Sequence, residues 1–379
     1  MNDPRADQTL TLLRDTLRRF VEKEVVPRAA AWEEQGFVPR EVLRAMGKLG
    51  FLGLRYAEAY GGGALDARAT ALLAEELGRC TFGGFAITVL VHTDMASPHL
   101  VNAGTPAQIA RYLPQIVAGE AITAVAVTEP DAGSDVKAIR TTARRDGGDW
   151  VLKGSKMFIT NGALADLYFV AAKTDPAAGA KGVSMFIVEK GTPGFAVGRK
   201  LDKMGWRCSD TAELVFEGCR VPAANLLGEE NQGFHAIMQN FQNERLAIAS
   251  MAMGEAAKAI ELTLEYVRTR KAFGAPLWDK QAIRQRLAML AARVEAGRQL
   301  VRCAADLDAE GRDCVKEVSM AKACCAELLN EVVYDCLQFH GGFGYIRESA
   351  IERMYRDARV QTIGGGATEV MLEEVAKRL

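Results

Sequence analysis

Apolar side chains recur at helical spacing through the first third of the chain. Three such stretches have as their apolar positions Leu10, Leu13, Leu17, Phe20 and Val21; Val42, Leu43, Met46 and Leu49 after Pro39; and Ile109, Tyr112, Leu113 and Ile116. The third stretch follows Thr105 and Pro106, which suit the N-cap and the first position of a helix. We therefore predict an N-terminal α-helical domain over residues 1–120.

The pattern changes after Gly119 to short apolar runs separated by glycine-containing turns. The turn from Asp146 to Asp149 precedes an apolar run at Trp150 and is typical of a β-hairpin. Further strands are predicted at 121–127, 167–173, 183–188, 194–199 and 213–216. Regular short strands of this kind favour a β-barrel or sandwich, so we predict a middle β domain over residues 121–230.

Long helical patterns return from Asn231 onward. We predict helices at 232–270, 279–309, 312–340 and 347–361, with a short one from about 367. Four long helices separated by Pro276, Gly311 and the glycines at 341–344 fit a four-helix bundle. The predicted fold class is therefore α+β, with a C-terminal helical bundle domain over residues 231–379.

Bulk composition excludes several classes of protein. The formal net charge is −1, from 47 basic and 48 acidic residues, so the sequence does not favour nucleic acid or an anionic membrane as partner. The apolar runs are too short for stable membrane insertion, and the first residues lack a secretory or transit signal, so a cytoplasmic protein is expected. The eight cysteines form no C-x-x-C pair, and no metal site is predicted.

One carboxylate interrupts an apolar helical face. Steps of four, three, four and three residues from Ile237 reach Phe241, Glu244, Ile248 and Met251. Burial would raise the pKa of the Glu244 carboxyl and make it a suitable general base for a weakly acidic C–H. From these residues alone, a position at the rim or a structural ion pair is the more common explanation for such a glutamate.

Four other stretches carry candidate chemistry, each with a simpler alternative. The turn at 128–135 could hold a phosphate or a ring edge, or be an ordinary loop. Phe158 could stack on a flat cofactor or belong to a core. The basic pair at 270–271 could bind a pyrophosphate or offset a helix dipole. The glycines at 341–344 allow close approach of a ligand or another backbone, and no Rossmann or P-loop fingerprint occurs.

Together these stretches resemble the acyl-CoA dehydrogenase family over essentially the whole chain. The matching segments are 127–135, 158–162, 227–229, 270–274 and 338–345 with 356–357. The resemblance implies FAD as cofactor, a homotetramer, and oxidation of an acyl-CoA substrate to the trans-2-enoyl-CoA. It also implies an electron-transferring flavoprotein as electron acceptor.

The resemblance assigns site residues by position. Those that would contact the flavin are Val127, Thr128, Phe158, Ile159 and Thr160; Ser134 would serve both cofactor and CoA. The ADP half of FAD, bound in a neighbouring subunit, would meet Arg270, Phe273, Gln281, Gln338, Gly341 and Gly342. Ala367 and Glu369 are also assigned to the cofactor, although Ala367 replaces the threonine usual in the motif. Substrate contacts are assigned to Ser134, Arg245, Gly365 and Gly366.

One departure from the motif selects the catalytic base. Many members carry it in a Tyr-Glu-Gly-Thr stretch, where this chain has Gly365 in place of the carboxylate. In long-chain and isovaleryl-type members the base precedes an arginine on a bundle helix, as Glu244 precedes Arg245. The resemblance thus implies that Glu244 takes the α-proton while flavin N5 takes the β-hydride. Arg245 would position substrate, since neighbouring helical residues face different directions.

The acyl group and the acceptor stay open from the sequence. Base placement favours a long or branched acyl chain, whose tail the 82–90 segment and the region of Leu100 would line if they are not simply helix core. An acyl-CoA oxidase using O₂, a flavin monooxygenase of the same fold and a non-enzymatic acyl-CoA-binding protein are the alternatives.

Overall fold

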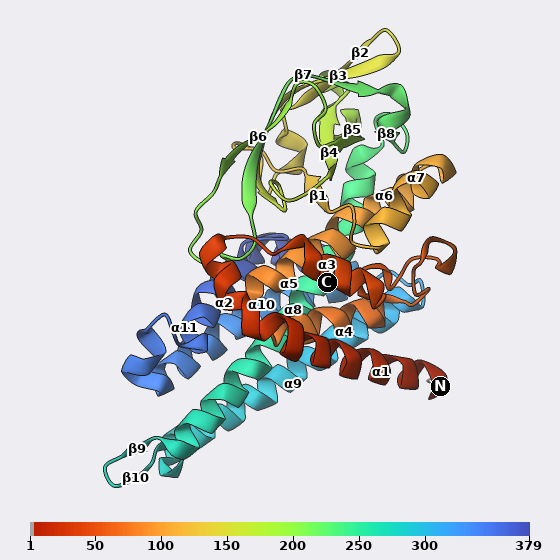
Figure 1. The fold of residues 1–379 in the computed structure, drawn as a ribbon. Helices are drawn as coiled ribbons and strands as arrows, with labels where there is room; N and C mark the ends of the chain where they lie inside the picture. The colour runs from red at the N-terminus through yellow and green to blue at the C-terminus, as the bar shows by residue number, and fades with distance from the viewer. Residues whose placement is uncertain (1–3) are drawn as a thin grey trace.

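The structure is a computed structural model that describes residues 4–379, and its N-terminal part is helical (Figure 1). Its α-helices are α1 (Pro4–Phe20), α2 (Val26–Gln35), α3 (Arg40–Lys48), α4 (Ala67–Gly78), α5 (Gly83–Leu90), α6 (Ser97–Ala103) and α7 (Pro106–Val117). Thr105 caps α7 in a reciprocal capping box with Gln108, as its sequence indicates. The prediction for Leu49 was wrong, because α3 ends at Lys48 and Leu49 is 49 % exposed.

The middle part is one eight-stranded sheet, which Figure 1 shows above the helices. Its strands are β1 (Thr123–Ala126), β2 (Thr142–Asp146), β3 (Asp149–Thr160), β4 (Leu167–Lys173), β5 (Val183–Glu189), β6 (Phe195–Lys200), β7 (Thr211–Pro222) and β8 (Leu226–Leu227). Their order is β6-β7-β3-β2-β4-β5-β8, with β1 parallel to β4. The predicted hairpin at 146–149 joins β2 to β3. Strands β4 and β5 are buried on both faces, which explains their continuous apolar sequence.

The C-terminal part is a bundle built around the longest helix, α8. Its helices are α8 (Gly233–Thr269), α9 (Gln281–Ala309), α10 (Val315–His340), α11 (Ala350–Ala358) and α12 (Thr368–Ala376). A two-stranded hairpin of β9 (Lys271–Ala272) and β10 (Ala275–Pro276) joins α8 to α9 at the tip of the bundle (Figure 1). The predicted α+β architecture is confirmed. Over residues 4–379, no helix has the length and apolar character needed to cross a bilayer.

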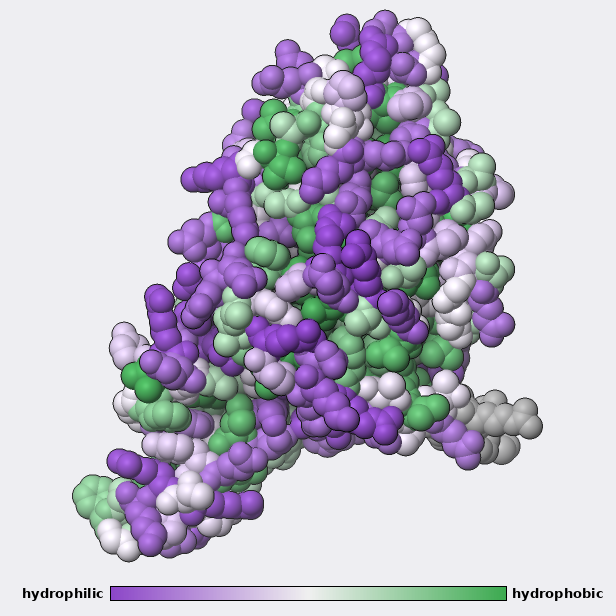
Figure 2. Space-filling model, in the orientation of Figure 1, coloured by the Kyte–Doolittle hydropathy of each residue, from purple (hydrophilic) through white to green (hydrophobic). Residues whose placement is uncertain are grey.

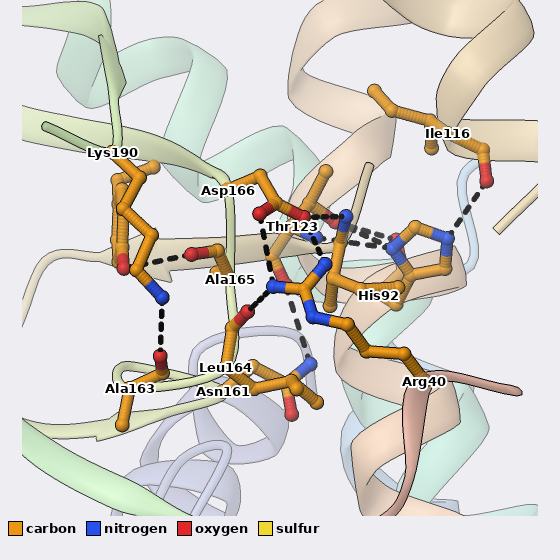
Figure 3. Close-up of polar contacts among 12 residues, drawn as sticks. Arg40, His92, Ile116, Thr123, Asn161, Ala163, Leu164, Ala165, Asp166 and Lys190 are labelled. Atoms are coloured by element: carbon orange, nitrogen blue, oxygen red, sulfur yellow. Dashed lines mark hydrogen bonds and ion pairs between the residues drawn. The ribbon is translucent and has the colours of Figure 1, made fainter. Parts of the chain in front are cut away.

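Hydrogen bonds and an ion pair connect the sheet region to the N-terminal helices (Figure 3). Arg40 of α3 donates to both carboxylate oxygens of Asp166, at 2.7 and 2.9 Å, and Asp166 also accepts from the Ile122 amide. Nearby, the His92 ring contacts the Thr123 hydroxyl at 3.0 Å. Burial lowers the pKa of His92 to about 4, so this ring is neutral. These contacts hold β1 and the start of β4 against α3 and the helical segment that carries His92.

Candidate active site

Glu244 lies on a buried face of α8, as the spacing predicts. Ile237, Ile248 and Met251 are at most 3 % exposed, Phe241 is partly buried and Glu244 is 8 % exposed. Burial raises the pKa of the Glu244 carboxyl to about 8, against the opposing effects of the Arg245 charge and the Asn240 amide. A carboxylate with this pKa is a competent proton acceptor near neutral pH.

The core cluster around this face joins all three parts of the chain. It contains Ile248 and Met251 from α8, and Val125 and Leu164 of the sheet region pack against it together with Val360. Glu244 therefore lies where the sheet, the N-terminal helices and the bundle meet. Water is largely excluded there, which strengthens electrostatic interactions.

Arg245 follows Glu244 in the sequence, but its side chain has different neighbours. Its side chain is 6 % exposed and its guanidinium lies over the Phe241 ring, 5.4 Å from the centroid. Among the described residues, nothing accepts a hydrogen bond from Arg245 Nε and no ion pair joins Arg245 to Glu244. Because a buried donor without a partner is rare, Arg245 is available to a ligand.

Gly365 and Gly366 lie against the same turn of α8. Both have left-handed backbone, with φ of 63° and 99°. A Cβ on Gly365 would be 2.3 Å from Ile248 Cδ1, and a Cβ on Gly366 would be 3.8 Å from Arg245 Nε. Lys322 Nζ donates to the Gly366 carbonyl, a contact that the sequence did not suggest. Within residues 4–379, the Gly365 and Gly366 N–H groups donate no hydrogen bond, so they can bind a ligand oxygen.

Ala367 and Glu369 follow directly at the start of α12. Ala367 occupies the N-cap position and supplies no side-chain cap to the helix. Glu369 is exposed in the first turn. A threonine at position 367 would offer a hydroxyl here, so the contact that the motif implies is reduced to backbone atoms.

A bulge in β3 presents Phe158 to solvent. Lys156 pairs with Leu214 while Ile159 pairs with Ala212, so the strand carries an irregularity at 157–158. Phe158 has φ of 60° and is 64 % exposed. A bulky residue in this conformation is strained, and such strain is concentrated at functional sites.

The turn after β1 lies beside this bulge. The Met157 amide donates to the Thr128 carbonyl at 2.9 Å, which brings Val127 and Thr128 next to Phe158. Thr160 is half-buried at the end of β3, and Ser134 is exposed farther along the turn. Ile159 is 3 % exposed, so only its backbone is available to a cofactor.

A buried ion pair shapes the same turn and was missed from the sequence. Lys156 Nζ donates to Glu129 Oε1 at 2.8 Å and to the Val127 carbonyl at 2.9 Å. Glu129 Oε1 also accepts from the Thr141 amide at 3.0 Å. Lys156 is 1 % exposed and Glu129 6 %. The two residues are 27 positions apart, so no local spacing could reveal the pair.

A second group of predicted residues gathers at the far tip of the bundle. The exposed residues there are Arg270, Phe273, Gln281, Gln338, Gly341 and Gly342. Tyr266 of α8 stacks on His340 of α10, with ring centroids 4.4 Å apart, and so joins the two helix ends. Phe273 is 98 % exposed at the turn of the β9–β10 hairpin, with φ of 54°, and Figure 2 shows apolar colour at this tip.

The tip lies far from Glu244 within one chain. Arg270 follows Glu244 by 26 positions along a continuous helix, or roughly 39 Å at 1.5 Å per residue. That separation exceeds the diameter of a small domain. The two groups of predicted residues are therefore not brought together by a single chain.

A cavity of about 540 Å³ opens beside the turn of α8 that precedes Glu244, where five segments of the chain meet. Arg55 crosses it, donating to Asn243 Oδ1 at 2.6 Å and to Asp308 Oδ2 at 2.7 Å. Its wall also includes Thr70, Thr93, Asp94, Gln239 and Gln242. The sequence did not indicate this polar lining, because its residues come from distant parts of the chain. Leu100 and the 82–90 segment are buried and do not line the cavity.

The sequence models of three acyl-CoA dehydrogenase domains match the chain. The N-terminal domain model matches residues 7–120, the middle domain model 124–219 and the C-terminal domain model 231–379. The chain belongs to the acyl-CoA dehydrogenase family. It is accordingly an oxidoreductase that dehydrogenates acyl-CoA with FAD as cofactor.

Curated relatives include enzymes of the two branches that the base position indicated. The long-chain specific acyl-CoA dehydrogenase of Mus musculus mitochondria is 45 % identical over 97 % of this chain and 86 % of its own length. The isovaleryl-CoA dehydrogenase of Oryza sativa mitochondria is 36 % identical, over 98 % of this chain and 91 % of its own length.

Solved structures agree with the fold of this acyl-CoA dehydrogenase. The enzyme from Geobacillus kaustophilus is 41 % identical with a TM-score of 0.94, covering 98 % of this chain and 97 % of its own. A chain in the electron transferring flavoprotein structure from Acidaminococcus fermentans is 37 % identical with a TM-score of 0.95, covering 97 % of each chain. The FAD complex of PigA is 28 % identical with a TM-score of 0.94, covering 98 % of this chain and 97 % of its own.

Proposed function

We propose that Glu244 is the catalytic base that removes the α-proton of an acyl-CoA. The observation that carries the proposal is the burial of Glu244, which raises the pKa of its carboxyl to about 8. The α-C–H of a thioester is a very weak acid, and a desolvated carboxylate gives the strongest proton acceptor that glutamate can provide. Asn240 and Arg245 only partly offset the effect of burial.

The residues at the bulge of β3 and in the turn after β1 fit FAD. Phe158 offers an exposed ring on a strained bulge, beside the polar turn that begins at Thr128. These residues would hold the flavin, which, when bound, accepts the hydride from the β-carbon of the substrate. Ser134, in the same turn, would contact both the cofactor and the CoA part of the substrate. Ala367 and Glu369 would approach the cofactor from the start of α12.

The tip residues would complete the cofactor site of another copy. Roughly 39 Å of α8 separates Arg270 from Glu244, so one chain could not hold both ends of the same FAD by these residues. The exposed Phe273 and the basic Arg270 suit an adenine ring and a pyrophosphate of a neighbouring subunit. This arrangement supports a homo-oligomer, for which we propose the tetramer that the family resemblance implies.

Backbone amides would stabilise the charge that develops on the thioester oxygen. The Gly365 and Gly366 N–H groups lie beside the turn of Glu244 and have no hydrogen-bond acceptor in the described chain. A preorganised donor of this kind typically contributes about 3 kcal/mol to a transition state. Arg245 would position the substrate from the neighbouring side, where its Nε is unpaired.

The function is tested by anaerobic reduction of the bound flavin with acyl-CoAs of graded length and branching. We expect rapid reduction and formation of the 2-enoyl-CoA, with the best chain being long or branched. Reoxidation by an electron-transferring flavoprotein, compared with peroxide formation under air, separates a dehydrogenase from an oxidase. Absence of flavin reduction by every acyl-CoA would contradict the proposal.

A glutamate at position 365 should be able to replace Glu244 as the catalytic base if the side chain at position 248 is made smaller. Gly365→Glu in a Glu244→Gln background would place its Cβ 2.3 Å from Ile248 Cδ1, on backbone that disfavours side chains by about 1 kcal/mol. We therefore expect little recovery from Gly365→Glu alone and more when Ile248→Ala is added, measured as the rate of flavin reduction. Equal failure of both variants would contradict the placement of the two positions around one substrate.

A further inference from the structure

The cavity beside α8 has apolar walls, which include Phe51, Leu73 and Val101, but it also carries polar groups that an alkyl chain would not need. Thr70, Thr93 and Asp94 form one part of its lining, and Gln239 and Asn243 of α8 form another. Gln242 also lines it, and within the described residues its Oε1 is buried without a hydrogen-bond donor. An apolar ligand would leave the Gln242 oxygen unpaired, which is unfavourable.

Asp94 is a buried carboxyl in this wall, and proton abstraction by Glu244 does not use it. It is 5 % exposed, and in residues 4–379 no ion pair joins it to a cation. The hydroxyls of Thr70 and Thr93 donate to its two oxygens, the first at 3.1 Å. Arg55 is the nearby charge that opposes the effect of burial, but its guanidinium is engaged by Asn243 and Asp308. Burial raises the pKa of Asp94, and the hydrogen bonds from Thr93 and Thr70 oppose that effect.

A hydrogen bond connects the helical segment that carries Asp94 to the turn of α8 that precedes Glu244. Asp94 lies in the π-helical segment η4 (Val91–Ala96), a form of helix that is frequent at functional sites. Asn240, one turn before Glu244 on α8, donates to the Met95 carbonyl at 2.8 Å and accepts from Asn243 at 3.0 Å. The cavity wall from Asn243 to Gln239 therefore runs beside the turn that precedes Glu244, over roughly 6 Å of helix.

We propose that this cavity binds the distal part of the acyl chain and that this part carries a hydroxyl group, which hydrogen-bonds to Asp94. The inference rests on the proposed function of Glu244 and names the substrate class for the same site. A hydroxyl matches this carboxyl because it can donate a hydrogen bond to an Asp94 oxygen. A carboxylate on the acyl chain fits less well, since Arg55 is already paired with Asp308.

Binding to the Glu244→Gln holoenzyme tests the inference without turnover. The probes are ω-hydroxyacyl-CoAs and unsubstituted acyl-CoAs of equal chain length, in a graded series. A site that hydrogen-bonds a substrate hydroxyl rejects the analogue that lacks it. We expect Kd at the best chain length to be lower for the hydroxylated probe by at least about tenfold.

Two substitutions at position 94 separate hydrogen bonding from charge. Asp94→Asn keeps a neutral donor and acceptor and should retain most of the preference, whereas Asp94→Leu should remove or reverse it. If Asp94→Leu does not fold, Thr70→Val is expected to weaken the preference by removing the donor 3.1 Å from Asp94 Oδ1.

Equal or weaker binding of every hydroxylated probe would overturn the inference, as would an unchanged preference in Thr70→Val and Asp94→Leu. These results differ from failure of the proposed function. If no acyl-CoA of either series reduces the flavin of the unsubstituted enzyme, the proposed function itself fails. If unsubstituted acyl-CoAs reduce it as efficiently as their hydroxylated counterparts, only the inference about Asp94 fails.

Discussion

Glu244→Gln is expected to slow flavin reduction by acyl-CoA about 10³- to 10⁴-fold while FAD stays bound, because the amide cannot accept the α-proton. Anaerobic rapid mixing of the variant with a good substrate measures the loss directly. The matched control is Glu255→Gln on the same helix. Glu255 is also buried, at 2 % exposed, but its carboxylate accepts from Gln361 at 2.8 Å and has no place in the proposed chemistry. Comparable losses in both variants would contradict a specific role for Glu244.

The same carboxyl gives this prediction a pH signature. The pKa of Glu244 is about 8, so below that pH most of the free enzyme carries a protonated base. The rate at low substrate concentration should rise about tenfold per pH unit up to pH 8 and then level off. The raised pKa also means that folding stability attributable to Glu244 falls as pH rises from about 4.5 to 8, because the folded state binds the proton more tightly. Glu244→Gln should remove both dependences.

Lys156→Met is expected to lower the free energy of unfolding by about 3–5 kcal/mol, since it leaves Glu129 buried without its cation. Urea unfolding followed by tryptophan fluorescence measures the change. The double variant Lys156→Met with Glu129→Gln should recover much of the loss, because no uncompensated charge stays buried. Lys153→Met on the same strand is the surface control, as Lys153 is exposed. A loss as small as that of Lys153→Met would show that the buried pair does not maintain the turn.

The sequence predicted best what depends on local periodicity. The face of α8 that holds Glu244 could be read from residue spacing, because helix geometry alone decides which side chains lie together. Leu49 shows the limit of that reasoning, since it continues the period of α3 but lies past the end of the helix and is exposed. Termini of elements depend on packing that a single face does not reveal.

Features built from distant segments could not be predicted in the same way. The Lys156–Glu129 pair joins a strand to a turn, and the cavity around Asp94 combines five segments of the chain. The closeness of Gly365 to Ile248 likewise requires the folded bundle. The exposure of Phe273 also depends on the folded chain, because the length of α8 carries it far from the core, and we propose that it contacts another copy of the chain.

The most direct test of the account is exchange of the α-hydrogen of an acyl-CoA analogue that can lose this proton but cannot transfer a β-hydride. The analogue, deuterated at the α-carbon, is bound to the FAD-loaded enzyme in ordinary water, and loss of deuterium is followed by mass spectrometry. Exchange should be rapid with Glu244 present, retained in Glu255→Gln and nearly absent in Glu244→Gln. Undiminished exchange in Glu244→Gln would contradict the assignment of Glu244 as the base.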